Sequence, residues 1–297
     1  MSDLIKTVTV KSLLETTAVK DRLFDILGKR ASTFATSVIQ IMNNNTSLAA
    51  CDPNSIVGAA MTSATLNLPL NNSLGYAYII PFNEKQSNGQ YIKKAQFQIG
   101  YKGFIQLAQR SGQFKTIHSD DVKQGEITSR DRLTGEMDFQ WHEDDVRAKF
   151  ETVGYFAYFK LLNGYEATLF MSMAQLNAHG KKFSSSFSKS FSLWKTDIDS
   201  MAKKTVLKLL LSKYAPLSID MQTAVQTDQA SFNDAENTQD ISYIDNEPPK
   251  EIDHDAERII TLIKTATTQE ELDFAKGHAG EQYLDLIKSK QKELNKQ

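Results

Sequence analysis

The sequence predicts a protein that mixes α-helices with antiparallel β-strands, and two observations carry this prediction. Apolar residues recur at helical spacing in several separate stretches, and segments rich in β-branched and aromatic residues lie between them. Turn residues such as Asn163-Gly164 separate neighbouring strand-like segments and predict hairpins. With 40% hydrophobic and 24% charged residues, the composition is that of a folded globular protein. It excludes a chain that is disordered, collagen-like or a coiled-coil rod throughout.

In the first third of the chain we expect helices followed by a β-hairpin. The expected segments are weak structure over 1–19, a helix over 20–45, a helix over 52–66, and strands near 76–80 and 95–99. Asp52 is a suitable N-cap for the second helix, and Pro53 suits its first turn. Ser87-Asn88-Gly89 has the composition of a hairpin tip between the two strands.

From residue 101 the chain is expected to combine helices with a run of strands. The expected helices cover 101–110, 172–180 and 191–213, and the expected strands cover 117–122, 125–128, 137–141, 151–162 and 165–172. Gly112 suits the end of the first of these helices, and Pro216 follows the last. The 191–213 helix is apolar on nearly all sides, which predicts burial in a core or between subunits.

The charge is divided along the chain. The formal net charge of −2 combines 20 acidic and 26 basic residues in 1–220 with 16 acidic and 8 basic residues in 221–297. We therefore expect three parts: a basic body over 1–220, an acidic flexible linker over 221–255, and a small helical segment over 256–297. A basic body with an acidic tail is typical of nucleic-acid-binding proteins, and an acidic linker kept for solubility is the alternative.

Several classes of function lack their motifs. No GxxxxGK[ST] phosphate loop and no GxGxxG occurs, so we expect no nucleotide hydrolysis. No run of about 18 apolar residues and no signal peptide is present, so we expect no membrane segment and a cytoplasmic protein. The single cysteine, Cys51, excludes an internal disulfide, and we expect it to be a buried thiol.

Two acidic clusters could be interpreted as metal sites. His118 lies near Asp120 and Asp121, and His142 precedes Glu143, Asp144 and Asp145. Neither spacing matches a recognised ligand geometry, so solvated loops are the favoured interpretation. We expect no cofactor, although magnesium could assist non-specifically by screening phosphates.

Basic residues mixed with amides mark the middle of the chain. Lys102, Gln106 and Arg110 share one face of the expected 101–110 helix, opposite Ile105 and Ala108. Such a stripe suits a phosphate backbone, because cations bind phosphates and amides bridge phosphate or sugar oxygens. A solvated helix face explains the same pattern.

Lysines also decorate the apolar 191–213 helix. An unpaired charge is costly to bury, so Lys203, Lys204 and Lys208 need either acids such as Asp197 and Asp199 or an anionic ligand.

Three segments resemble the RecT family of phage single-strand annealing proteins. They are Leu68-Pro-Leu-Asn-Asn-Ser-Leu-Gly-Tyr-Ala-Tyr-Ile-Ile-Pro81, Gln96-Phe-Gln-Ile-Gly-Tyr-Lys-Gly-Phe-Ile-Gln-Leu-Ala-Gln-Arg-Ser-Gly112, and Trp194-Lys-Thr-Asp-Ile-Asp-Ser-Met-Ala-Lys-Lys-Thr-Val206 with its continuation Lys213-Tyr-Ala-Pro-Leu-Ser218. The resemblance covers about residues 30–220. It implies an α+β fold with a curved antiparallel sheet backed by helices, as in Red beta-type recombinases, that assembles into a ring or helical filament.

The same resemblance implies what the protein does. It implies an ATP-independent recombinase of a bacteriophage, active in the bacterial host cytoplasm, that anneals complementary strands and catalyses no covalent step. The implied partners are single-stranded DNA and the annealed duplex, further copies of the chain, a phage exonuclease and the host single-strand-binding protein. On this basis the candidate DNA-binding residues are Lys102, Gln106, Arg110, Lys115, Lys123, Arg130, Lys203, Lys204 and Lys208.

Two other functions stay open at this point. A metal-dependent nuclease would use Asp120, Asp121, Glu143 and Asp144, and would cut strands when magnesium is present. A passive filament-forming scaffold would form oligomers without cooperative DNA binding.

Overall fold

The computed structural model describes residues 8–85, 89–184, 186–190, 192–235, 237–238, 240–243, 263, 265–266, 268–278 and 284–294. The chain divides into two compact units, Met1–Asn246 and Glu247–Gln297. Each unit is described by itself.

Short helices open the first unit. They are α1 (Val10–Leu14), α2 (Thr17–Leu27), the 3-10 turn η1 (Gly28–Arg30), α3 (Ala31–Asn43), α4 (Thr46–Ala49) and α5 (Pro53–Thr65). The expectation of weak structure over 1–19 is wrong for 8–19, because Val10 and Leu14 are buried in the core; residues 1–7 lie outside the described residues. The expected 20–45 helix is interrupted at Gly28, whose φ of 55° ends α2. Asp52 caps α5 as predicted, since its Oδ2 accepts the Ser55 N–H at 3.1 Å.

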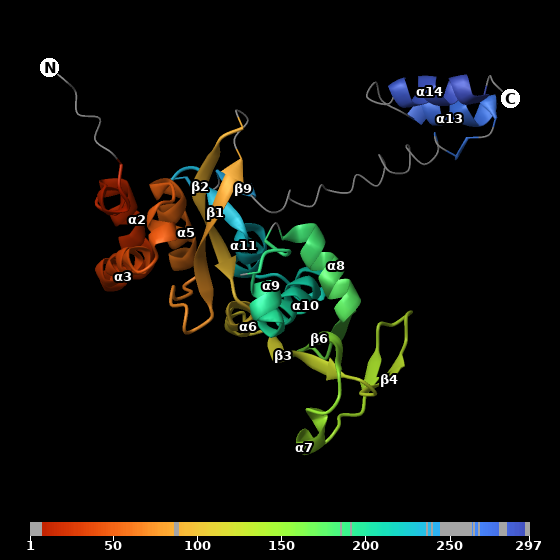
Figure 1. Ribbon diagram of the computed structural model, residues 1–297, viewed down its shortest axis with the longest axis horizontal. Helices are drawn as coiled ribbons and strands as arrows, with labels where there is room; N and C mark the ends of the chain where they lie inside the picture. Colours follow the sequence, from red (N-terminus) through yellow and green to blue (C-terminus); the bar gives the residue numbers. More distant parts are fainter. Residues whose placement is uncertain are drawn as a thin grey trace. The chain divides into compact units, whose positions relative to one another are not determined.

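An antiparallel sheet lies against α5. Its strands are ordered β1 (Ala77–Lys85), β2 (Tyr91–Ile99), β8 (Ala230–Phe232) and β9 (Ile241–Tyr243). The N-terminal helices lie on one side of the β1–β2 ribbon, and α6, α9, α10 and α11 lie on the other (Figure 1). The Ser55 hydroxyl of α5 accepts the Ala95 N–H of β2, which fixes the helix to the sheet.

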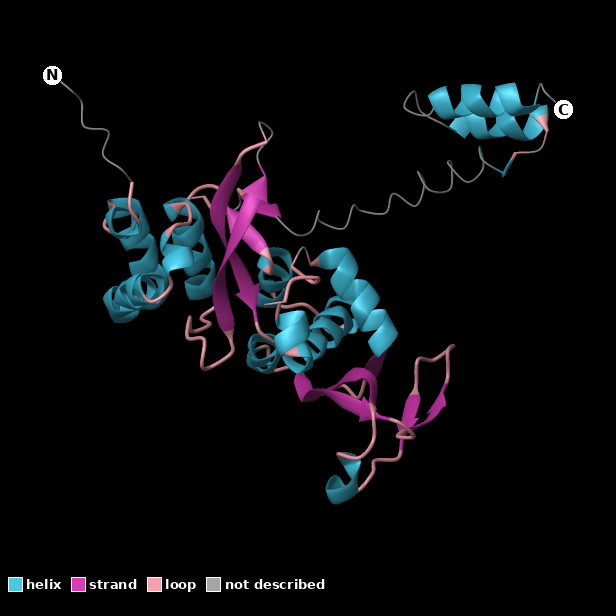
Figure 2. Cartoon of the chain, viewed as in Figure 1, coloured by secondary structure: helices cyan, strands magenta, loops and turns pink. Residues whose placement is uncertain are grey.

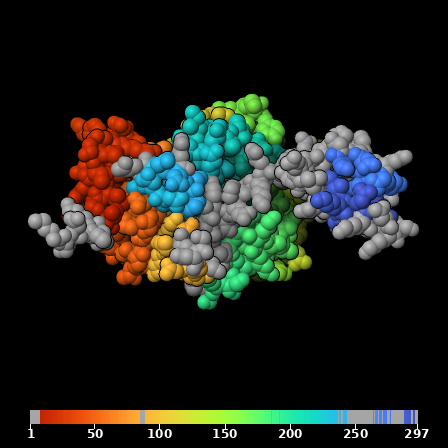
Figure 3. All heavy atoms as spheres, turned by 90° about the horizontal axis from the view of Figure 1, so that it is seen from above, coloured from red at the N-terminus to blue at the C-terminus, as the bar shows by residue number. Residues whose placement is uncertain are grey.

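The start of the expected linker belongs to the folded unit. Helix α11 (Ile219–Thr227) and strand β8 follow α10, and Met221, Ala224 and Phe232 are fully buried. The segment around β8, light blue in Figure 3, lies beside the N-terminal helices, and the Arg22 guanidinium donates to Thr238 Oγ1 at 2.8 Å. The expectation of a linker is therefore wrong for residues 221–232 and for strand β9 at 241–243, which pairs with β8. A few apolar residues in this polar segment pack against residues far away in the chain. Residues 244–255 lie outside the described residues.

A second sheet follows helix α6 (Tyr101–Arg110). Its strand order is β3 (Phe114–Lys123), β6 (Thr152–Leu161) and β7 (Glu166–Ser172), all antiparallel. A separate hairpin of β4 (Ile127–Arg130) and β5 (Met137–Phe139) and the short helix α7 (Asp144–Arg147) connect β3 to β6 (Figure 2). The five expected strands are all confirmed, with shifted ends. The described strands form three open sheets rather than the single curved sheet that was expected.

Three helices lie between β7 and α11 in the chain. They are α8 (Met173–Phe183), α9 (Leu193–Thr196) and α10 (Ile198–Tyr214). Ser172 caps α8 with a capping box, and α8 continues past Gly180, its expected end. The expected 191–213 helix is broken at Asp197, whose side chain caps α10 by accepting the Ser200 N–H. Helix α10 packs on β3, β6, β7 and α6, so burial within its own unit accounts for its apolar residues.

The second unit contains helices α13 (Gln269–His278) and α14 (Leu284–Leu294), which confirms helical structure for the described part of 256–297. Leu272 and Ile287 are buried. Across both units the architecture is α+β, with antiparallel strands and sheets that do not close. No helix in the described parts of the chain has the length and apolar character needed to cross a membrane.

Candidate nucleic-acid interface

A groove of about 410 Å³ runs between the first sheet and the segment that precedes α10; we call it the sheet groove. Ile80 and Phe82 of β1 and Gln98 of β2 line it. Cross-strand partners in an antiparallel pair point to the same side of a sheet, and the pairs Tyr78–Gln98, Ile80–Gln96 and Phe82–Lys94 all lie on the side away from α5. This face of the β1–β2 ribbon, which carries amide and apolar side chains, is therefore the floor of the groove.

Amide side chains are ordered along this floor. The Gln98 Nε2 donates to Gln96 Oε1 at 2.7 Å, and Gln96 Nε2 donates to the Gln229 carbonyl at 2.7 Å. Gln96 is completely buried and Gln98 partly exposed. The buried amide thus orients the exposed one, which faces the groove.

Hydroxyl and ammonium groups form the walls. The lining residues that carry these groups are Ser47, Lys93, Ser184, Ser186, Lys189 and Ser192. None of the described residues that line the groove is Asp or Glu. A surface of hydroxyls, amides and lysines without carboxylates suits a phosphodiester backbone, because nothing in it repels the phosphates.

Aromatic packing positions the serine-rich wall. Phe187 lies against Trp194, with ring centroids 5.7 Å apart. A Cβ atom on Gly180 of α8 would lie only 2.5 Å from the Phe187 ring. Because Gly180 has no side chain, the Phe187 ring can pack against α8. This contact positions the serine-rich segment beside the β1–β2 ribbon.

Two of the predicted DNA-binding residues on α10, Lys204 and Lys208, are engaged inside the fold. Lys204 Nζ lies 2.9 Å from Asp228 Oδ1, and Lys208 Nζ lies 2.6 Å from Asp228 Oδ2. Asp228 also accepts the Ile99 N–H at 2.9 Å. Burial alone would raise the pKa of Asp228, but the two ammonium groups and this N–H outweigh it and hold the pKa at about 2. The partner of Lys204 and Lys208 is thus an acid, Asp228, and neither Asp197 nor Asp199, the two acids that the sequence suggested.

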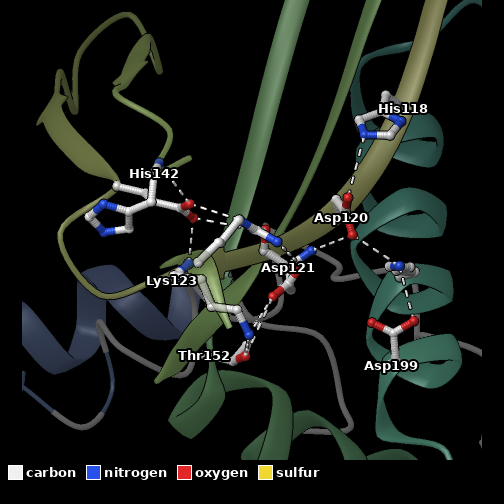
Figure 4. Close-up of polar contacts among 10 residues, drawn as sticks. His118, Asp120, Asp121, Lys123, His142, Thr152 and Asp199 are labelled. Carbon is white, nitrogen blue, oxygen red and sulfur yellow. Dashed lines mark hydrogen bonds and ion pairs between the residues drawn. The ribbon is translucent and has the colours of Figure 1, made fainter. Parts of the chain in front are cut away.

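Two further predicted residues also have acidic partners. Lys203 Nζ lies 3.0 Å from both Asp120 and Asp199, which confirms Asp199 as a partner for the α10 lysines. Lys123 Nζ lies 2.9 Å from Asp121 and donates to Thr152 Oγ1 (Figure 4).

Arg110 of α6 contacts neighbouring helices, and the Gln106 side chain is half-buried. The Arg110 guanidinium donates to the carbonyls of Leu66 and Asn67 at the end of α5 and lies 3.5 Å from Asp220 of α11. The Gln106 Oε1 is buried and accepts no hydrogen bond from the described residues. Arg110 therefore joins three helices, and the shared face with Lys102 is only partly open.

Lys102, Lys115 and Arg130 are exposed, and none forms an ion pair with a described residue. Their role in DNA binding stays a prediction. The serines of the 184–192 segment were missed, because uncharged polar residues in a loop carry no signal in a single sequence beyond the Ser-rich composition of 181–190.

Two of the four acids that would serve a nuclease, Asp120 and Asp121, are paired with cations. Asp121 lies 2.9 Å from Lys123 and 3.0 Å from Arg147. Burial would raise the pKa of Asp121, but hydrogen bonds from these two cations lower it overall. Among the described residues no group of three His, Cys, Asp or Glu side chains is placed to hold a metal ion.

The open antiparallel sheets and the carboxylate-free groove define a candidate polyanion-binding protein. A family model described as the RecT family matches residues 32–242, a range that contains the whole sheet groove. The chain is 43% identical over 245 residues to the uncharacterized protein YqaK of Bacillus subtilis (strain 168), which covers 81% of this chain and 80% of that protein. It is 30% identical over 187 residues to Protein RecT of Escherichia coli (strain K12), which covers 60% and 64% of the two chains. The chain belongs to the RecT family.

Proposed function

We propose that this protein binds single-stranded DNA and anneals complementary strands in recombination, without ATP and without making or breaking a covalent bond. Membership of the RecT family supports this role. The single structural observation that carries it is the sheet groove, in which amides, hydroxyls and lysines lie beside apolar side chains and none of the described lining residues is Asp or Glu.

The chemistry of the groove suits annealing because it grips a backbone without reading bases. Lys93 and Lys189 supply charge, and the serines and Gln98 supply neutral hydrogen-bonding groups for phosphate or sugar oxygens. Such contacts carry no sequence information, so they accept any strand and leave base edges free for a complementary strand.

The test is annealing of two complementary dye-labelled oligonucleotides without ATP and with excess EDTA. The proposal expects strong acceleration over the protein-free rate. No acceleration would refute it, and cleavage on addition of magnesium would favour a nuclease instead. Binding without acceleration would favour a passive scaffold.

Replacing the groove lysines with neutral residues tests whether DNA binds in the sheet groove. Lys93→Gln and Lys189→Gln should each weaken binding of all sequences alike and lower the slope of log affinity against log salt by about 0.7 per phosphate contact. Lys20→Gln changes an exposed lysine on α2, outside the groove, and serves as the matched control. Equal effects in all three variants would show that the groove has no special role.

The remaining expectations accompany this proposal. We propose that the chain self-associates into a ring or helical filament on DNA, holds the annealed duplex, and works in the bacterial cytoplasm with a phage exonuclease and the host single-strand-binding protein. We also propose that no cofactor is required and that the second unit contacts a partner. Size measurements with and without DNA, and pull-down by the isolated exonuclease or binding protein, test these points.

A further inference from the structure

A second groove, of about 590 Å³, lies between the β4–β5 hairpin and the edge of the second sheet; we call it the hairpin groove. Arg130 and Arg132 line one wall, and Lys213 at the end of α10 lines another. Phe170 of β7 and Tyr214 supply aromatic surface. None of these residues lines the sheet groove.

The three cations of the hairpin groove are available for a ligand. All three side chains are exposed, and no described residue forms an ion pair with any of them. Lys213 lies over the Tyr214 ring at 5.1 Å from its centroid, which keeps its ammonium group beside an aromatic face.

Among the described residues that line the hairpin groove, Asp131 is the one carboxylate, and it is already engaged. Asp131 Oδ1 accepts the N–H groups of Leu133 at 2.7 Å and Thr134 at 3.4 Å in the hairpin turn. These hydrogen bonds lower the pKa of Asp131, so its carboxylate stays ionised and sets one negative charge against the three cations. The groove therefore presents an excess of positive charge.

The hairpin that forms one wall is firmly attached at its base. Glu126, which is completely buried, accepts from Arg147 Nε at 2.8 Å and from the Lys123 N–H at 2.6 Å. Phe139 stacks on Trp141 with 4.9 Å between centroids, and both rings pack against Phe156 of β6. Arg130 and Arg132 are thus carried by a wall anchored to the second sheet.

The two grooves are far enough apart to act on different strands. Met201 lines the sheet groove and Lys213 lines the hairpin groove, and both belong to α10. Twelve residues along an α-helix span about 18 Å at 1.5 Å per residue. The Debye length at physiological salt is about 8 Å, so cations in one groove do little to neutralise phosphates in the other.

We propose that the hairpin groove binds a second polynucleotide strand, through its phosphates and by stacking on Phe170 and Tyr214, while the sheet groove holds the first. This proposal rests on the proposed function. Two polyanions repel each other, and a separate set of cations lowers the free energy of bringing the second strand beside the first. Arginine and aromatic side chains together are typical of sites for single strands.

The test separates first-strand from second-strand binding. Protein is saturated with an unlabelled oligonucleotide, a labelled non-complementary oligonucleotide is added, and its binding is followed by fluorescence anisotropy. The variant is Arg130→Gln/Arg132→Gln/Lys213→Gln, and the control is Lys20→Gln/Lys29→Gln/Arg30→Gln, which removes three exposed charges near α2. Thermal melting verifies that each variant is folded, and Tyr214→Leu provides a second route if the triple variant is not.

The expected result is at least tenfold weaker binding of the second oligonucleotide by the triple variant, with less than twofold change in binding of the first. Unchanged second-strand binding would overturn the proposal. Equal loss for both oligonucleotides would also overturn it, because the two grooves would then form one continuous site. A change in oligomer size alone would assign the groove to contacts between copies. This test measures binding and not annealing. A protein that failed the annealing assay would refute the proposed function, but binding of the second oligonucleotide to the hairpin groove could still be measured.

Discussion

Asp228 is the clearest place to test how the fold is held together. It is completely buried, and it is the only described acid within 4.0 Å of Lys204 and Lys208. We expect Asp228→Asn to destabilise the first unit by about 3–5 kcal/mol, because it leaves two ammonium groups without a counter-charge where water is scarce. For a unit of this size that corresponds to a fall in melting temperature of roughly 6–20 °C.

The pH dependence gives an independent measure of the same interaction. The pKa of Asp228 is about 2 in the fold, against an ordinary value of 3.8. A carboxylate with a lowered pKa stabilises the fold above its unfolded value, and that stability is lost as the pH falls towards the folded value. The difference corresponds to about 2 kcal/mol. This contribution should be complete above about pH 4 and should disappear towards pH 2.

The assay is urea unfolding of the native protein and the variant at pH 7 and across pH 2–5. The exposed ion pair of Asp220 with Arg110, at 3.5 Å, supplies a matched control on the neighbouring helix, and Asp220→Asn should cost less than about 1 kcal/mol. Adding Lys204→Met to Asp228→Asn should restore part of the stability, since it removes one buried charge. A loss below 1 kcal/mol with an unchanged pH profile would refute the reasoning.

Three further predictions follow from packing and burial. Gly58→Ala places a methyl group 2.4 Å from the Phe232 Cβ, so it should destabilise the unit by about 1–3 kcal/mol in urea unfolding. Gly180→Ala should displace the Phe187 ring and weaken single-strand binding by anisotropy more than it lowers the melting temperature; the reverse pattern would contradict its role at the groove wall. Burial raises the pKa of Cys51 to about 11, so a thiol reagent at pH 8 should label it only in urea.

Local signals in the sequence predicted the local structure well. Asp52 and Ser172 cap their helices as expected, and the turn at Asn163-Gly164 joins β6 to β7 with Gly164 at a φ of 93°. These features depend on a few neighbouring residues, so spacing and residue type are sufficient to indicate them.

Features that depend on distant residues were missed. Strand β8 pairs Ser231 with Gln96 of β2, and nothing in the acidic composition after residue 220 indicates that pairing. The interruption at Asp197 was missed for a different reason: the apolar residues of α9 and α10 continue the same helical pattern across it. A single sequence contains the hydrophobic pattern of a segment but not the surface that the segment meets.

The same limit explains the mixed outcome for the site. Of the eight lysines and arginines predicted to bind DNA, five have carboxylate partners: Arg110, Lys123, Lys203, Lys204 and Lys208. Each phosphate contact contributes about 0.7 to the slope of log affinity against log salt. Eight free cations would therefore give a slope of about 6, whereas Lys102, Lys115 and Arg130, which have no carboxylate partner among the described residues, give about 2. The net charge of the basic body therefore overstates the charge available to one strand. Tight binding then requires added contacts, such as those of the two grooves, or several copies along one strand.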